Sequence, residues 1–412
     1  MDRRSFLNRT LGAALGAAGA GAAPAPAAAA DPVDPRFAPS GSRPAPRAPT
    51  SLPWTPRGPR PRLRDLGLAP GRLPAGPLNA LTDVPGVRVG VATRIEDSAP
   101  ASSLEPIRSG VTAILAAAPG RPASAGVFIL NGNGEMVGTE EVRATGRLEA
   151  PILFTGTANI GRVYQGAMAW MADTYGAGTF FPPVVGETWD RGLSEVNSRP
   201  IGEPETRAAI GAAAGGPVAE GAVGGGTGME CYEFKGGNGT ASRRVEAAGR
   251  TWTVGALVQA NHGSRHELRV DGVPVGEEIT DLMPEEPRSS KSILLLLATD
   301  APLDGLQCER LARRAALGLA RTGATSHHGS GDLVLAVSTT GARSDTLIND
   351  EQIDPLWVAA IEAIEEAILN ALCKAVTMAG ARGRLVHALP IDRLVQVLIR
   401  HGRLRPASGS AP

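Results

Sequence analysis

The sequence has few aromatic residues and no excess of charge of either sign. Aromatic residues make up 4% of the 412 residues, and 41 basic residues are balanced by 41 acidic ones. Proteins that bind nucleic acid need a basic surface, and those that bind single strands also need aromatic side chains on which bases stack. The composition therefore argues against a nucleic-acid partner. The chain is long enough for one large domain or two, with an ordinary apolar fraction of 42%.

The sequence also lacks the usual patterns for disulfides, metal ions and nucleotides. The adjacent His327 and His328 have no further ligand at a metal-site spacing. The glycines near residue 134 do not match GxGxxG, and segment 224–228 lacks the lysine of a phosphate loop. Three widely spaced cysteines cannot all pair, so we expect each to be a small core residue. They are Cys231, Cys308 and Cys373. We therefore expect no metal and no cofactor.

The first 62 residues have the composition of an export signal followed by a tether. Arg3 and Arg4 form a twin-arginine pair, an alanine-rich and weakly apolar stretch follows, and small residues up to Ala30 offer a cleavage site. Residues 31–62 are rich in proline, arginine and alanine and cannot bury enough apolar surface to fold. We expect a periplasmic or secreted protein, without a stable membrane span once residues 1–30 are removed. A retained anchor is the alternative.

Apolar periodicity predicts both strands and helices in the rest of the chain. Short apolar runs between glycine and proline turns indicate strands, and apolar residues every three or four positions indicate helices. The expected strands cover 87–91, 111–115, 126–130, 152–155, 251–259, 333–337 and the run that starts at residue 292, with a hairpin at 268–275. The expected helices cover 160–172, 304–321, 355–378 and 391–401. This mixture favours an α+β fold without the regular alternation of a Rossmann domain.

A serine stands at the head of the most apolar of these runs. Lys291 and Ser292 precede one isoleucine and four leucines, which is typical of a strand buried on both faces. Ser330 and Asp332 lie just before a second such run. If the two strands are neighbours, two hydroxyls and a carboxylate meet at their ends, as an activated nucleophile requires. Taken alone, either segment is equally an ordinary polar turn before a strand.

At these residues the sequence resembles the self-cleaving aminopeptidases of the DmpA and BapA type. The segment SILLLLATDAPL, which begins at Ser292, resembles the start of the small subunit in that family. Other matching blocks follow one another in the family's order between about residues 64 and 398. They are PLNALTDVPG, LNGNGEMVG, VVGETWD, GAVGGGTGM, FKGG, VQAN, LARRAALGLARTG and EAILNALC. The resemblance implies a four-layer α/β/β/α sandwich, N-terminal-nucleophile-like and shared with ornithine acetyltransferases, formed by a large subunit (63–291) and a small subunit (292–412) of one precursor.

The resemblance also implies roles for individual residues. Ser292 would attack the carbonyl of Lys291 and cut the chain there. The new α-amine, with a reference pKa of about 8, would then serve as general base. Ser330 and Asp332 would hydrogen-bond to the nucleophile and orient its amine, and Asn261 would donate to the developing oxyanion. The implied substrate-binding residues are Glu187, Trp189, Glu135 and Lys235.

Among these, Glu187 would receive the substrate's ammonium group, because an aminopeptidase needs a shielded negative charge to select a free amine.

Two positions depart from the family. Many relatives have glycine where this chain has Lys291, and glycine tolerates the strained backbone of an acyl shift. Trp189 stands where several relatives have a tyrosine that helps to hold the attacked carbonyl oxygen. Some relatives carry glutamate in place of Asp332.

The sequence therefore predicts an exported, self-processed serine aminopeptidase that acts through an acyl-enzyme on Ser292. Its substrates would be small peptides or aminoacyl amides and esters, with β-amino and D-alanyl compounds and a homo-oligomer of processed heterodimers as further implications of the resemblance. Two alternatives stay open. One is an acyltransferase of the ornithine acetyltransferase group, whose members use threonine at the position of Ser292. The other is a non-catalytic ligand-binding homologue that Lys291 leaves uncut.

Overall fold

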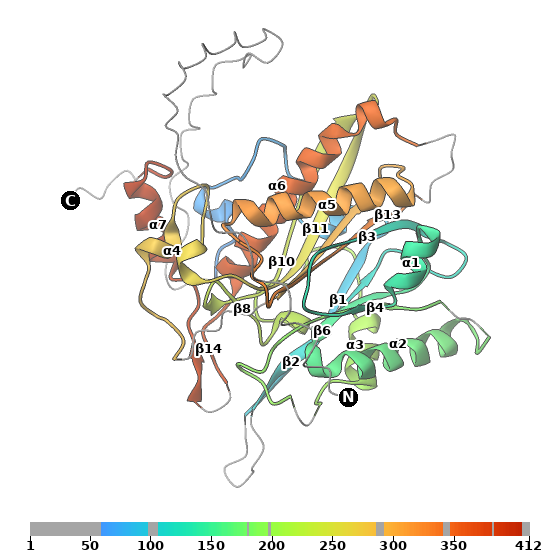
Figure 1. The fold of residues 1–412 in the computed structure, drawn as a ribbon, viewed down its shortest axis with the longest axis horizontal. Helices are drawn as coiled ribbons and strands as arrows, with labels where there is room; N and C mark the ends of the chain where they lie inside the picture. The colour runs from blue at the N-terminus through green and yellow to red at the C-terminus, as the bar shows by residue number, and fades with distance from the viewer. Residues whose placement is uncertain are drawn as a thin grey trace, which may run out of the picture. The chain divides into compact units, whose positions relative to one another are not determined.

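Two β-sheets lie face to face at the centre of the computed structural model (Figure 1). The five-stranded sheet has the order β1 (Arg88–Glu96), β2 (Ile107–Leu115), β6 (Ile152–Gly156), β7 (Val184–Thr188) and β4 (Met136–Val137). The six-stranded sheet has the order β10 (Gly237–Ala247), β11 (Arg250–Asn261), β12 (Ser292–Thr299), β13 (Gly331–Ser338), β3 (Ala123–Gly132) and β5 (Arg147–Leu148). The β12–β13 and β6–β7 pairs are parallel, and the other pairs are antiparallel.

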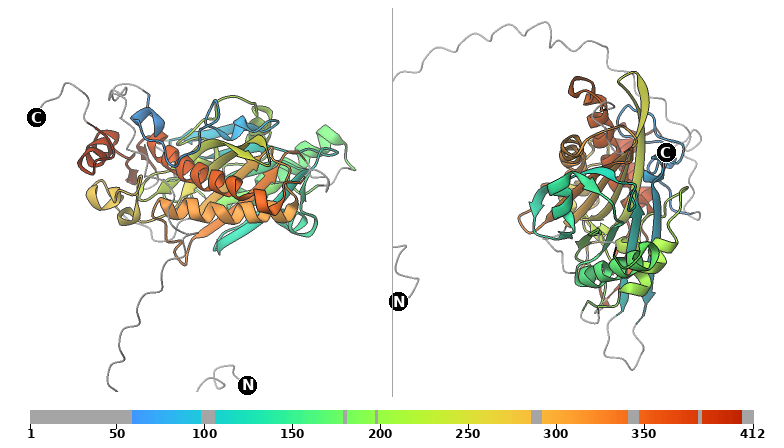
Figure 2. Two further views of the ribbon diagram at one scale, coloured as in Figure 1. Left: turned by 90° about the horizontal axis from the view of Figure 1, so that it is seen from above. Right: turned by 90° about the vertical axis from the view of Figure 1, so that its right-hand side faces the viewer.

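Helices cover the outer face of each sheet. Helices α2 (Ile160–Tyr175) and α3 (Glu203–Gly211) lie on the five-stranded sheet, and α5 (Gly305–Arg321) and α6 (Asp354–Lys374) lie side by side on the six-stranded sheet (Figures 1 and 2). Further α-helices and strands lie outside these four layers. They are α1 (Thr139–Thr145), β8 (Glu230–Cys231), β9 (Phe234–Lys235), α4 (Val275–Glu278), β14 (Met378–Ala379), β15 (Leu385–Val386) and α7 (Ile391–Arg400). The predicted four-layer α/β/β/α sandwich is confirmed.

The structure describes residues 59–97, 106–178, 181–196, 199–285, 292–340, 347–380 and 383–405, which belong to one unit of the chain, residues 48–412. The expected export signal and Lys291 lie outside the described residues. The end of the expected tether lies inside them: Arg60 donates to Cys373 O and to Leu389 O, both at 2.7 Å. Contacts with the folded unit therefore begin at least three residues before Leu63, because the Arg60 guanidinium group satisfies two main-chain carbonyls there.

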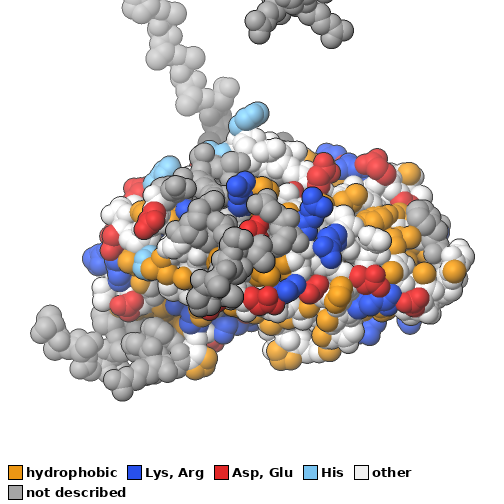
Figure 3. All heavy atoms as spheres, turned by 90° about the horizontal axis from the view of Figure 1, so that it is seen from below, with side chains coloured by type: hydrophobic (Ala, Val, Ile, Leu, Met, Phe, Trp, Pro, Cys, Tyr) orange, Lys and Arg blue, Asp and Glu red, His pale blue; other side chains and the backbone are white. Residues whose placement is uncertain are grey.

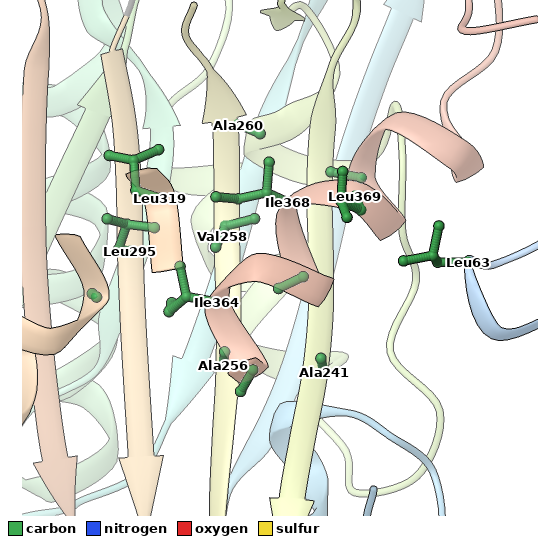
Figure 4. Packing of buried hydrophobic residues seen from close by; sticks show 14 of the residues in the cluster. Leu63, Ala241, Ala256, Val258, Ala260, Leu295, Leu319, Ile364, Ile368 and Leu369 are labelled. Carbon is green, nitrogen blue, oxygen red and sulfur yellow. The ribbon is translucent and has the colours of Figure 1, made fainter. Parts of the chain in front are cut away.

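Strand β12 explains why its sequence is apolar at every position. Leu294 and Leu296 point between the two sheets, whereas Leu295 and Leu297 point toward the helices, and all four are fully buried. Figure 4 shows Leu295 on its strand beside Ile364 of α6. A strand with a helix layer on one face and a second sheet on the other has no solvent-facing side, so the period-two alternation is lost.

Most of the expected helices and strands are present, with ends that differ by a few residues; α6, for example, ends at Lys374 and not at residue 378. The expected hairpin is reduced to a bridge between Val270 and Val273, around a two-residue turn in which Asp271 and Gly272 both have positive φ. Strands β7 and β10 and helix α3 were not predicted. Strand β10 is rich in small and polar residues, because α6 crosses it closely: a Cβ on Gly239 would lie 1.9 Å from Ala367 O.

The described residues also bear on the predictions about the cysteines, a membrane span, metal ions and surface charge. All three cysteines are buried, as predicted. In the part of the chain that the structure describes, no helix has the length and apolar character needed to cross a bilayer. Among the same residues, no cluster of His, Cys, Asp or Glu side chains is arranged to hold a metal ion. Acidic and basic side chains are interspersed on the face drawn in Figure 3.

Candidate active site

The three strands β11, β12 and β13 bring the predicted catalytic residues together. Asn261 at the end of β11 pairs with Ser292 at the start of β12, and Ile293 pairs with Asp332 at the start of β13. Ser292 is 8% exposed, and its hydroxyl accepts a hydrogen bond from Gly331 N at 3.0 Å. The prediction that the two apolar strands are neighbours is confirmed. Because β12 and β13 are parallel neighbours, their polar first residues lie at the same end of the sheet.

Ser330 and Asp332 form a buried pair beside the nucleophile. The Ser330 hydroxyl donates to Asp332 Oδ1 at 2.7 Å, and the two residues are 2% and 1% exposed. Burial raises the pKa of the Asp332 carboxyl, and the hydrogen bond from Ser330 opposes that shift. The main chain between them holds Ser292 through Gly331 N. The pair is therefore connected to the nucleophile through one peptide unit.

Two asparagines that the sequence reasoning did not single out brace this turn. Asn131 Nδ2 donates to Ser330 O at 2.6 Å, and Asn133 Nδ2 donates to Gly329 O at 2.8 Å. The approach is close: a Cβ on Gly331 would lie 2.7 Å from Asn133 O. The signal for this role is the alternation of asparagine and glycine in LNGNGE, which places two amides on one side of the chain at the end of β3.

Asn261 is held by the main chain of two separate segments. Its Oδ1 accepts from Glu230 N at 2.8 Å, and its Nδ2 donates to Trp189 O at 3.3 Å. Asn261 is 3% exposed, whereas Trp189 is 39% exposed. An amide nitrogen carries two hydrogens, and the bond to Trp189 O uses one of them. The second hydrogen has no acceptor among the described residues.

Glu187 is a buried carboxylate beside the nucleophile turn. Its Oε1 accepts from Glu135 N at 3.0 Å, and its Oε2 accepts from the Thr157 hydroxyl. Burial raises the pKa of Glu187, and these two hydrogen bonds oppose the shift. A Cβ on Gly134 would lie 3.3 Å from Glu187 Oε1 and 3.4 Å from Gly331 Cα. The carboxylate and the turn that binds Ser292 therefore flank the same glycine.

The other two predicted substrate-binding residues lie in different surroundings. The Glu135 side chain is exposed, and its main chain is what contacts Glu187. Lys235 is fully buried, and its Nζ donates to Met229 O and Gly236 O, each at 2.9 Å, and to Gly226 O at 3.4 Å. Burial lowers its pKa to about 7. With three carbonyl acceptors, Lys235 holds the glycine-rich loop, and a direct contact with substrate stays a prediction.

Asp190 is a further buried acid in the same segment, and the sequence reasoning did not assign it a role. It is 1% exposed, its Oδ2 accepts from the Ser109 hydroxyl at 2.7 Å, and its Oδ1 has no hydrogen-bond partner among the described residues. Burial raises the pKa of Asp190 to about 6. The negative charge of Glu187 adds to that shift.

We expect Asp190→Asn to stabilise the protein at neutral pH. The folded pKa of about 6 exceeds the ordinary value of 3.8, so the wild type loses stability as pH rises through this range, by roughly 3 kcal/mol in total. The asparagine variant lacks this loss. Urea unfolding from pH 4 to pH 8, in a Ser292→Ala background that keeps the chain in one piece, measures the difference. Asp350→Asn, at an exposed ion pair with Arg310, is the control and should show no such gain; equal pH dependence of Asp190→Asn and wild type would contradict the prediction.

The fold and the site together define a class of enzyme. A buried serine begins an inner strand of a four-layer sandwich and has an amide, a hydroxyl–carboxylate pair and a further buried carboxylate around it; this is the arrangement of serine aminopeptidases and amidases of the N-terminal-nucleophile type. The chain belongs to peptidase family S58, whose model matches residues 79–386.

Curated relatives and solved structures agree with this assignment. The chain is 42% identical to beta-peptidyl aminopeptidase BapA of Sphingosinicella xenopeptidilytica over an alignment of 366 positions, which covers 82% of this chain and 91% of the relative. It resembles the structure of the L-aminopeptidase D-Ala-esterase/amidase from Ochrobactrum anthropi, with 43% identity, a TM-score of 0.78 and coverage of 84% and 100% of the two chains. It also resembles a beta-aminopeptidase from Burkholderia sp., with 43% identity, a TM-score of 0.74 and coverage of 85% and 100%. Neither the acyltransferase nor the binding-protein alternative is favoured by these relatives.

Proposed function

We propose that the protein cuts its own chain before Ser292 and then releases N-terminal residues from small peptides, amides or esters that carry a free amine. The observation that carries this proposal is the position of Glu187. Its buried carboxylate shares one glycine, Gly134, with the turn that binds the nucleophile. A carboxylate that is shielded from water and lies beside the nucleophile attracts an ammonium group and would hold a substrate by its amino end.

In the first step, Ser292 Oγ attacks the carbonyl carbon of residue 291 and the C–N bond breaks. The nitrogen of Ser292 keeps the electron pair of that bond and takes the proton of the hydroxyl, which makes it a free α-amine. Water then hydrolyses the ester that joins residue 291 to Ser292 Oγ. In catalysis the neutral α-amine accepts the hydroxyl proton as Oγ attacks the substrate carbonyl. Asn261 Nδ2 stabilises the charge on the carbonyl oxygen, and the Ser330–Asp332 pair orients the amine. The leaving amine takes the proton, and water then hydrolyses the acyl-enzyme.

The substrate class follows from the names of the relatives. Two of them are β-peptidyl aminopeptidases, and one solved neighbour acts as an L-aminopeptidase and D-Ala esterase or amidase. We therefore propose β-amino-acyl, L-aminoacyl and D-alanyl amides as the compounds to test. The twin-arginine pair at Arg3 and Arg4 supports export to the periplasm, and the processed heterodimers are proposed to associate into a homo-oligomer.

The processed enzyme is expected to cleave β-alanyl, L-alanyl or D-alanyl p-nitroanilide and to leave the N-acetylated form of the same compound nearly uncut. Acetylation removes the charge that Glu187 would bind. Glu187→Gln should lower kcat/KM on the free-amine compound by about 10- to 100-fold, the value of a hydrogen bond between charged groups. Release of p-nitroaniline measures both effects.

The control for this experiment is Glu140→Gln, which changes an exposed glutamate on α1 and should leave kcat/KM unchanged. A processed wild type that is inert on the whole panel would contradict the proposed activity. Equal rates on the free and acetylated compounds would contradict the role of Glu187 while leaving amidase activity in place.

A further inference from the structure

The hairpin formed by β14 and β15 reaches from the small subunit to the large subunit beside the active site. Gly380 N donates to Arg384 O at 2.8 Å within the hairpin, and a Cβ on Gly380 would lie 2.4 Å from Leu193 Cα. Leu193 is buried with Met378 and Val386 of the hairpin in a small apolar cluster. The hairpin is thus docked on the turn that directly follows Trp189 and Asp190.

One ion pair at this contact is almost completely buried. Arg384 Nε donates to Glu230 Oε1 at 3.0 Å, and the Arg384 NH2 group donates to Glu230 Oε2 at 2.8 Å. The two side chains are 8% and 5% exposed. The two parallel bonds match the fork of a guanidinium to the two oxygens of a carboxylate, a geometry that lysine cannot reproduce. A Cβ on Gly192 would lie 2.3 Å from Glu230 Oε1, so the turn packs directly on the pair.

Glu230 connects this pair to the residue beside the nucleophile. Its main-chain N–H donates to Asn261 Oδ1 at 2.8 Å, and Asn261 pairs with Ser292 across the sheet. A side-chain amide can be turned over by 180°, which exchanges its oxygen and nitrogen. Because the Glu230 N–H donates to Oδ1 of Asn261, it favours the amide orientation in which Nδ2 points away from Glu230 and toward Trp189 O. The position of Glu230 therefore decides whether Asn261 presents a donor to the site.

We propose that Arg384 of the small subunit is a positioning residue for catalysis, because it holds Glu230 where its N–H orients the amide of Asn261. This inference rests on the proposed role of Asn261 as the donor to the oxyanion. It places a small-subunit residue in control of a large-subunit catalytic group, so the oxyanion donor is in place only while the β14–β15 hairpin is docked.

The test compares Arg384→Met and Arg384→Lys with wild type in the p-nitroanilide assay. Oxyanion stabilisation acts in the transition state, so Arg384→Met should lower kcat by about 10- to 100-fold and leave KM within about threefold. Arg384→Lys restores the charge without the fork and should recover part of kcat. The control, Arg393→Met, removes an exposed ion pair between the same two subunits, Arg393 with Asp281, and should change neither constant.

A double-mutant cycle with Asn261→Ala separates positioning from a general structural effect. If Arg384 acts through Asn261, then Arg384→Met should lower kcat by no more than about twofold in the Asn261→Ala background. If Asn261→Ala slows processing, the rate of precursor cleavage gives the same cycle. Two results would overturn the proposal. One is a double variant whose loss of kcat equals the product of the two single losses, and the other is an Arg384→Lys variant with a lowered thermal midpoint and unchanged kcat. A wild type that is inert on the panel would instead show that the proposed function itself has failed.

Discussion

Ser292→Ala is expected to remain one uncut chain without detectable peptidase activity. The hydroxyl that attacks the carbonyl of residue 291 is absent, so the peptide bond persists and the α-amine that would serve as general base never forms. The loss should approach the roughly 10⁶-fold seen when a serine nucleophile is removed from a peptidase. Intact mass and a denaturing gel on freshly purified protein measure the cleavage. The p-nitroanilide assay measures the activity.

Two controls make this result specific. Ser338→Ala changes a buried serine at the far end of β13 and should be cut like the wild type. Lys291 creates a site for trypsin-like proteases, so Lys291→Gln distinguishes self-cleavage, which should continue, from cleavage by a contaminant. A wild type that stays uncut would contradict self-processing. Cleavage of both wild type and Ser292→Ala would show that another protease acts on this bond.

Arg243→Met is expected to destabilise the folded protein by about 3–5 kcal/mol, the cost of leaving buried charges without their partner. Arg243 is fully buried, with its Nε 3.1 Å from Glu362 Oε2 and its NH2 group 2.8 Å from Glu366 Oε2. Glu366 also binds Arg64 at 2.7 Å. Burial alone would raise the pKa of Glu366, but the two guanidinium groups outweigh it and lower that pKa. Without Arg243, Glu362 loses its guanidinium partner and Glu366 keeps only Arg64, while both carboxylates remain desolvated.

This cluster lies between the two predicted subunits, since Arg64 and Arg243 precede Ser292 and the two glutamates follow it. Once the chain is cut, the cluster is one of the contacts that hold the subunits together. Urea unfolding and size-exclusion chromatography of the processed protein measure the expected loss. The control is Arg400→Met, which removes a more exposed pair with Glu278 between the same subunits and should cost no more than about 1 kcal/mol. Equal unfolding midpoints for Arg243→Met and Arg400→Met would contradict the argument.

Strand β12 was readable from the sequence because its residues respond to a simple environment. Each leucine of the run is buried in one of two apolar layers, and an unbroken apolar run is the direct consequence of two covered faces. Strand β10 was not readable for the opposite reason. Its residue types are set by the close crossing of α6 and by the charged cluster at Arg243. Both involve residues more than a hundred positions away in the sequence.

The site shows the same division. The local pattern predicted that three polar residues lie at the starts of strands, because they stand next to apolar runs: Ser292, Ser330 and Asp332. The family resemblance indicated which residues have catalytic roles. The hydrogen bonds to Glu187 were not predicted: Thr157 comes from the connection after β6, and the N–H of Glu135 from the connection after β3. No local pattern at either residue indicates that they meet, because sheet order decides which connections share an edge.

By itself, the sequence determined the α+β character of this protein, its buried central strand and the serine at the head of that strand. Those properties follow from local apolar periodicity and from the burial that each segment demands. Only the tertiary structure decided that Asn261 is oriented by Glu230, that Glu230 is held by Arg384, and that Lys235 faces three carbonyls. These contacts depend on the order of strands and on the docking of one short hairpin, and the free energy that selects them is spread over many distant residues.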